Sequence, residues 1–147
     1  MDKPLSVWYC DTCGDKINDS THGYVIWRSA GNPHDFKIIH QKDCDHKDHS
    51  SSAALDDFLG PRGLSYCLTF LSAGPIIHNL NGSSNQPHPN LSEFVDFMRR
   101  VQVPHYEQAR RSFSNSDLLS HLSDSNEFAP YIPETLFRIA NEYAVGR

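Results

Sequence analysis

The sequence WYCDTCGDKI, residues 8–17, contains the pattern that decides the N-terminal fold. Cys10 and Cys13 are separated by two residues, and this spacing is typical of a metal site or a redox-active pair. A thioredoxin-like redox pair would open a helix, whereas strand-like sequence follows Gly14 here. Gly14 also permits the unusual backbone of a tight turn. The spacing therefore predicts that both thiolates bind one metal ion.

The sequence HQKDC, residues 40–44, supplies the other half of the predicted metal site. Residues 23–29 and 35–40 are rich in β-branched and aromatic residues and flank a turn, so they predict a hairpin. This hairpin returns the chain to the C-x2-C turn, which we call the knuckle. Zinc in structural sites takes four thiolate or imidazole ligands in a tetrahedron. The predicted ligands of one structural Zn²⁺ are Cys10, Cys13, His40 and Cys44.

Three other histidines compete with Cys44 for the fourth ligand position. His46 and His49 follow it within five residues, and His22 lies in the first loop. Cys44 is preferred because thiolate binds zinc strongly and three cysteines with one histidine make a common closed site. The segment 43–49 could instead hold a second metal ion or a general base, although its polar composition is more typical of a solvated surface loop.

The segment WYCDTCGDKI, the hairpin and HQKDC together resemble zinc-ribbon and LIM-type zinc knuckles over residues 8–44. The resemblance implies a zinc-stapled β module and no particular activity. A complete LIM domain would show a second set of four ligands, which the four cysteines of this chain cannot supply. A nucleic-acid-binding ribbon usually carries a basic hairpin, whereas residues 1–60 have a net charge of −4. The rest of the chain resembles no characterised family.

The remainder of the chain shows helical periodicity. Residues 79–90 are turn formers almost throughout, so they predict a mobile surface loop that interrupts the helical part. Cys67, inside the apolar sequence LSYCLTFL, is predicted to be a core residue. The predicted helical segments are a short turn at 53–59, a buried helix at 64–71, a helix at 91–103 capped by Asn90 or Ser92, one starting at Pro104, one starting near Asn115 or Ser116, and one starting at Pro133.

These patterns predict an α+β fold in which an N-terminal zinc-stapled β-hairpin module packs on a C-terminal helical bundle. The predicted units are a zinc-binding β module at 1–52 and a helical domain at 53–147. Zinc would stabilise a segment that is too small to hold itself. We expect Trp8, Tyr9 and Trp27 to seal the module onto the helices.

Composition and missing motifs exclude several function classes. The chain has 147 residues, a net charge of −5 and no apolar run of the roughly 18 residues that a membrane helix needs. The start lacks a basic-then-apolar signal region, so we expect a cytoplasmic protein with no membrane partner. Neither H-E-x-x-H nor G-x-S-x-G occurs, and no glutamate precedes Glu93. A deaminase would need such a glutamate near its metal histidine. No catalytic residues are therefore predicted.

The leading prediction is a small intracellular binding protein, an adaptor or inhibitor that acts through a protein–protein surface. One alternative is a nucleic-acid binder that uses the two basic pairs, Arg99-Arg100 and Arg110-Arg111. These pairs would form one patch if two helices run antiparallel across Pro104. The other alternative is a metal-dependent hydrolase or nuclease that uses the 43–49 segment.

Overall fold

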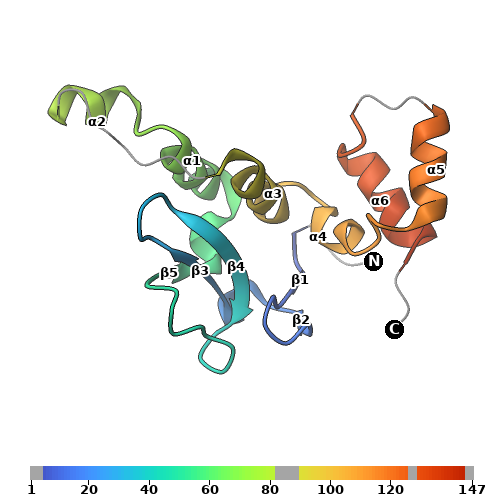
Figure 1. Cartoon of the computed structure of the whole chain (residues 1–147), viewed down its shortest axis with the longest axis horizontal. Helices are drawn as coiled ribbons and strands as arrows, with labels where there is room; N and C mark the ends of the chain where they lie inside the picture. The colour runs from blue at the N-terminus through green and yellow to red at the C-terminus, as the bar shows by residue number, and fades with distance from the viewer. Residues whose placement is uncertain (1–4, 82–89, 126–128, 145–147) are drawn as a thin grey trace.

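The structure, a computed structural model, describes residues 5–81, 90–125 and 129–144. Antiparallel strands form the N-terminal part and helices form the rest, which confirms the predicted α+β class (Figure 1). Among the helices in these described ranges, none combines the length and the apolar character that crossing a membrane requires.

Two small antiparallel sheets make up the N-terminal part. β1 (Trp8–Tyr9) pairs with β2 (Lys16–Ile17), and the knuckle lies between them. In the second sheet β3 (Gly23–Arg28) lies between β4 (His34–His40) and β5 (Ser51–Ala54). The antiparallel pairing of β3 with β4 confirms the predicted hairpin.

Strand β5 differs from the prediction, which places a loop up to residue 52 and a helical turn from residue 53. Its sequence SSAA lacks the β-branched and aromatic residues that mark a strand. Its extended conformation comes from hydrogen-bonded pairing with β3, in which Trp27 lies opposite Ser51, and not from its own composition. The predicted boundary between residues 52 and 53 therefore falls inside a strand.

The hydrophobic core forms two clusters, and the division between them does not fall at residue 52. One cluster of buried side chains extends from β1 through the second sheet to α1 (Gly60–Leu71) and α3 (Leu91–Gln102). The β module thus shares its core with the first helices, and Figure 1 shows α1 and α3 beside the second sheet. A second cluster joins three helices, α4 (Tyr106–Arg110), α5 (Ser116–Ser125) and α6 (Pro133–Glu142).

Two tryptophans join the sheets to the helices, as predicted. The Trp27 ring meets Phe58 and Phe70 edge-on, with centroids 6.2 and 5.5 Å apart, a geometry that aromatic pairs prefer. Phe58 ends the 3-10 helix η2 (Leu55–Phe58), and Phe70 belongs to α1. Trp8 is buried, and its indole N–H donates to the backbone carbonyl of Arg100 in α3 at 3.0 Å.

Helix α1 differs from the prediction in its start and its burial. The prediction ends a helical turn at Gly60-Pro61, whereas α1 begins there, with Pro61 in its first turn. Proline fits that position because the N–H it lacks would have no partner within the helix. Leu64 and Leu68 are exposed, so α1 is not buried on every side. Cys67 is fully buried, which confirms it as a core residue, and burial raises the pKa of its thiol to about 11.

Helix α2 (Gly74–Asn81) was not foreseen, because the predicted surface loop begins at residue 79. Residues 82–89 of that predicted loop lie outside the described residues. The cap of α3 follows the prediction, since the Asn90 side chain accepts the backbone N–H of Glu93 at 3.1 Å.

The starts of the last three helices lie close to those predicted. α6 begins at Pro133. α5 follows Asn115, whose side chain accepts the backbone N–H of Leu118 at 3.1 Å. α4 begins two residues after Pro104, because His105 takes a left-handed backbone with φ 69° before the helix starts.

Gly63 in α1 provides the first testable prediction, because a Cβ at this position would overlap the backbone of Phe58. We expect Gly63→Ala to lower the free energy of unfolding by about 2 kcal/mol, since overpacking costs about 1–3 kcal/mol. Side-chain rotation cannot relieve a clash with backbone. Urea unfolding measures the change, with Ser65→Ala on the exposed face of α1 as the control. An unchanged midpoint for Gly63→Ala would contradict this close approach.

Candidate metal centre

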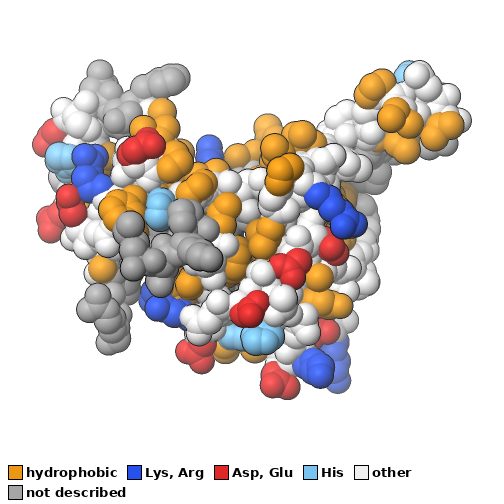
Figure 2. Space-filling view, turned by 180° about the vertical axis from the view of Figure 1, so that it is seen from behind, with side chains coloured by type: hydrophobic (Ala, Val, Ile, Leu, Met, Phe, Trp, Pro, Cys, Tyr) orange, Lys and Arg blue, Asp and Glu red, His pale blue; other side chains and the backbone are white. Residues whose placement is uncertain are grey.

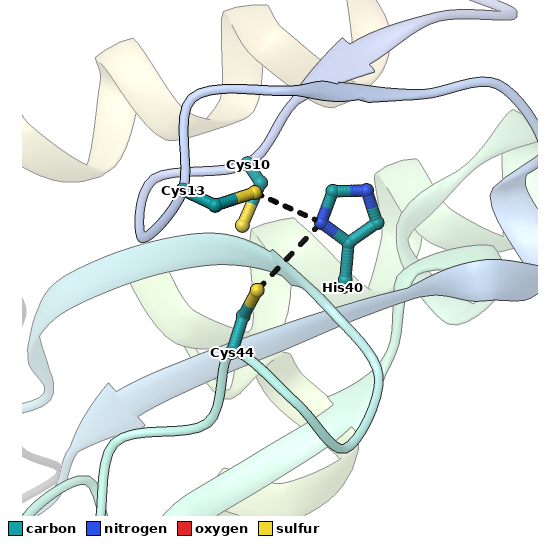
Figure 3. A group of neighbouring side chains, drawn as sticks. All are labelled: Cys10, Cys13, His40 and Cys44. Carbon is teal, nitrogen blue, oxygen red and sulfur yellow. Dashed lines mark hydrogen bonds between the residues drawn. The ribbon is translucent and has the colours of Figure 1, made fainter.

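The structure brings the four predicted ligands together into one group, which we call the thiol–imidazole cluster. Their ligand atoms all lie within 4.8 Å of one another. Figure 3 shows the three sulfur atoms and the His40 ring converging from the knuckle, from the end of β4 and from the turn after β4. The members of the cluster are Cys10, Cys13, His40 and Cys44.

Backbone hydrogen bonds shape the knuckle. The Gly14 N–H donates to the carbonyl of Cys10 at 2.9 Å, and Gly14 has a φ of 81°, in the left-handed region that glycine tolerates. The Cys10 N–H donates to the carbonyl of Asp15 at 2.9 Å and closes the turn. The Thr12 N–H points at the Cys10 sulfur, 3.4 Å away. One tight turn therefore delivers both thiols to the same point.

A backbone acceptor orients the His40 ring. Its Nε2 lies 3.0 Å from the carbonyl oxygen of Lys16, so the Nε2–H donates there and the lone pair resides on Nδ1. Nδ1 lies 3.4 Å from the Cys13 sulfur and 3.8 Å from the Cys44 sulfur. Tetrahedral zinc, with Zn–S near 2.3 Å and Zn–N near 2.0 Å, places sulfur and nitrogen about 3.5 Å apart. The observed separations fit such a site.

The electrostatics of the cluster favour a bound cation. Burial raises the pKa of Cys44, and the thiols of Cys10 and Cys13 raise it further, to about 12. Burial also raises the pKa of Cys10, but backbone donors, among them the Cys13 N–H, and the His40 ring outweigh burial and lower it to about 6. Three thiolates at this distance repel one another unless positive charge lies between them. A divalent metal ion supplies that charge and displaces the thiol protons.

The donor set and its completeness indicate the kind of metal site. Three sulfurs and one nitrogen suit a borderline-soft ion such as zinc far better than the hard ions magnesium and calcium. Four protein ligands fill a tetrahedron and leave no position for water or substrate. The arrangement matches that of a structural site, in which an ion would hold the knuckle against the end of β4.

The other candidates for the fourth ligand lie apart from the cluster. His46 and His49 form a separate group with Asp48. His22, which is also among the described residues, belongs to neither group. Cys44 thus completes the set that the structure assembles.

A buried ion-pair network, which the sequence did not reveal, ties the knuckle to the helices. Arg100 Nη1 donates to Asp11 Oδ2 at 2.7 Å, and Nε and Nη2 each donate to a Glu107 oxygen at 2.7 Å. Asp11 Oδ2 also accepts the backbone N–H of Ile38 in β4 at 2.8 Å. Glu107 Oε2 accepts the backbone N–H of Tyr9 at 2.9 Å. Because Arg100 is 89 residues from Asp11 along the chain, no local motif announces the pair.

The predicted arginine patch is not assembled as an open surface. Arg100 is only 3% exposed and is held by the ion-pair network, so it cannot reach a phosphate. The other three arginines contact partners within the chain: Arg99 lies over the Tyr131 ring at 4.4 Å, Arg111 over the Tyr9 ring at 4.1 Å, and Arg110 pairs with Asp96 at 3.3 Å. The contact between Tyr9 and Arg111 also adds Tyr9 to the predicted seal between the β module and the helices.

No protein-family model, curated protein or solved structure matches this chain. The likeness of residues 8–44 to zinc-ribbon and LIM-type knuckles therefore stays an expectation from the sequence. The candidate site rests on the geometry of its own residues.

Cys13→Ser tests the cluster as a metal site. Cys13 is exposed, so exchanging its sulfur for oxygen removes little packing, and a surface change of this kind normally alters stability by less than about 0.5 kcal/mol. If the thiol is a zinc ligand, the variant should lose its metal and most of its stability, because structural zinc contributes folding free energy directly. Elemental mass spectrometry and thermal melting measure both.

Cys67→Ser is the matched control for this experiment, because it removes a thiol that lies outside the cluster. It should melt at a lower temperature through its loss of core packing, yet retain one tightly bound zinc per chain. A Cys13→Ser protein with unchanged metal content and melting would contradict the structural site.

Arg100→Met tests the ion-pair network. The change leaves the buried Glu107 with only the more distant Arg110, whose Nε lies 3.9 Å away, and breaking a buried pair from one side costs about 3–5 kcal/mol. Urea unfolding should show a loss of this size, and a double variant with Glu107→Gln should recover part of it. Arg138→Met, on an exposed position of α6, is the control and should be nearly neutral. An unchanged free energy of unfolding for Arg100→Met would show that the network does not stabilise the fold.

Proposed function

We propose that this chain is a small zinc-stabilised protein-binding module, an adaptor or inhibitor, whose docking element is α2. The zinc ion in the thiol–imidazole cluster supports the fold and takes no part in a reaction. The exposed apolar face of α2 is the observation that carries the proposal.

Helix α2 presents large apolar side chains that the other described residues leave uncovered. Ile76 and Leu80, one helical turn apart, are each 74% exposed, and Ile77 beside them is also exposed. The helix projects from the body of the molecule, with hydrophobic side chains gathered on it (Figures 1 and 2). Apolar surface concentrated in this way marks interaction sites on proteins.

The chemistry of α2 specifies the partner surface. Leu80 follows Ile76 by four residues and Ile77 by three, so the three side chains lie on one side of the helix. This spacing is the pattern by which a short helix anchors in an apolar groove. Its sequence GPIIHNLN carries no Asp, Glu, Lys or Arg. Binding would therefore rest on burial of apolar area, and we expect an affinity that varies little with salt. The proposed partner is a protein with a hydrophobic groove about two helical turns long.

The arginine contacts favour this proposal over a nucleic-acid interface, and the closed cluster favours it over catalysis at the thiol–imidazole site. A nucleic-acid interface would need the basic pairs to be available, and Arg100 is buried in an ion pair. A hydrolase that used the thiol–imidazole cluster would need an open metal position, which four protein ligands do not leave. The four free cysteines suit a reducing compartment, so the proposed location is the cytoplasm.

A photo-crosslinking residue at position 80 tests the docking face, with position 78 as the matched control. His78 is exposed on the same helix and lies about 160° around the axis from Leu80. We expect position 80 to capture one defined protein in cells and position 78 to capture far less of it. The purified partner should then bind Leu80→Lys at least tenfold more weakly, because burial of a leucine contributes about 1.5–3 kcal/mol.

Two results would overturn the proposed function. One is capture of a second copy of this chain alone, which would make α2 a self-association surface. The other is a captured protein whose affinity is the same for Leu80→Lys and for the unchanged chain. Zinc content and melting of the variant, compared with those of the unchanged chain, exclude a loss of fold as the cause.

A further inference from the structure

A second group of metal-ligating side chains lies in the segment between β4 and β5. His46, Asp48 and His49 each offer one ligand atom, and these atoms lie within 4.8 Å of one another. The rings of the two histidines meet edge-on with centroids 5.2 Å apart. Because β4 and β5 both pair with β3, both ends of this segment are anchored in the sheet.

The His49 ring is buried and held by carboxylates on both sides. Its side chain is 1% exposed, with Nε2 3.0 Å from Asp35 Oδ2 and Nδ1 3.2 Å from Asp48 Oδ1. Whichever ring nitrogen carries the single proton of a neutral imidazole, the lone pair of the other faces a carboxylate oxygen, of Asp48 or of Asp35. Two lone pairs at this distance repel unless a positive charge lies between them. That charge is either a second ring proton or a metal ion.

A hydroxyl relay orients the His46 ring. The Thr12 hydroxyl donates its single proton to the carbonyl oxygen of Cys44 at 2.9 Å. Its oxygen must therefore accept at its other contact, 2.8 Å from His46 Nε2. His46 thus bears its proton on Nε2, and its Nδ1 carries the lone pair. His46 thus has a fixed tautomer that leaves Nδ1 available to a metal ion, as is typical of histidine ligands. In His49 the tautomer with Nε2–H on Asp35 presents Nδ1 on the side of Asp48.

Arg28 fixes the third ligand from behind. Its Nη2 donates to Asp48 Oδ2 at 2.5 Å, which leaves Oδ1 directed to His49. Arg28 Nε also donates to Asp35 Oδ2 at 3.1 Å. The carboxylates of Asp35 and Asp48 balance the charge of Arg28 and of Lys37, which lies 3.6 Å from Asp35. Each ligand is thus held by an outer partner: His46 by Thr12, Asp48 by Arg28 and His49 by Asp35. Because the charges of these two carboxylates and two cations cancel, they do not by themselves repel a divalent ion.

We propose that His46, Asp48 and His49 form a second site for a divalent transition metal such as zinc, separate from the thiol–imidazole cluster. Two imidazoles and one carboxylate suit zinc and its neighbours, and three protein ligands leave a coordination position open to water. Binding there is weaker than at the thiolates, since the donors are neutral or shared with Arg28. The proposal is independent of the protein-binding role of α2.

Calorimetric titration of Zn²⁺ into protein already loaded with one equivalent tests the second site. We expect a second, weaker binding event of one ion per chain. His46→Ala and Asp48→Asn should each weaken that event at least tenfold and leave the first ion in place. His49 is not substituted, because its buried ring supports the fold. His22→Ala, an exposed histidine outside both groups, is the control and should behave as the unchanged chain.

Three outcomes would overturn the proposal. The first is a single binding event in the unchanged chain, which would make the contacts of His49 with Asp35 and Asp48 purely structural. The second is a second event of equal strength in His46→Ala and Asp48→Asn. The third is loss of the first ion in His46→Ala, which would assign His46 to the thiol–imidazole cluster.

Discussion

Three thiols and one imidazole held within 4.8 Å form the constraint on which the N-terminal half depends. The strands of the first sheet are only two residues long, too short to be stable by themselves. The cluster joins the knuckle to the end of β4, across the 26 residues that separate Cys13 from His40. A metal ion there would stabilise contacts between two chain segments that backbone pairing alone would hold weakly.

The knuckle connects the metal cluster to the helices, because Asp11 lies between the two cysteines. Its carboxylate accepts both from Arg100 of α3 and from the backbone of β4, so one side chain joins three parts of the fold. The ion pair is favourable only while every partner is in place, since an unpaired charge in this setting is costly. Loss of the metal and loss of the network should therefore affect each other. Because the sheets share one core with α1 and α3, loss of packing on either side should also weaken the other.

Local patterns in the sequence were sufficient to predict the hairpin and the four residues that the structure brings together in the thiol–imidazole cluster. The C-x2-C spacing and the position of His40 at a strand end carry their own geometry, and the Asn90 cap and the start of α6 at Pro133 are local too. Strand β5 was missed because SSAA is ordered only by its pairing with β3. The arginine-patch alternative needs Arg100 at the surface, and its burial leaves no local signal because its partner Asp11 is 89 residues away. Features set by distant parts of the chain leave no local signal, whereas features set by spacing do.

The central claim is that three thiolates and one imidazole close on a single ion. X-ray absorption at the zinc edge, on protein holding one equivalent of zinc, measures that ligand set directly. The account predicts three sulfur neighbours near 2.3 Å and one nitrogen near 2.0 Å, with no oxygen. A first shell with two sulfurs or fewer, or with an oxygen ligand, would contradict it, since Cys44 would then lie outside the site or a position would be open to water.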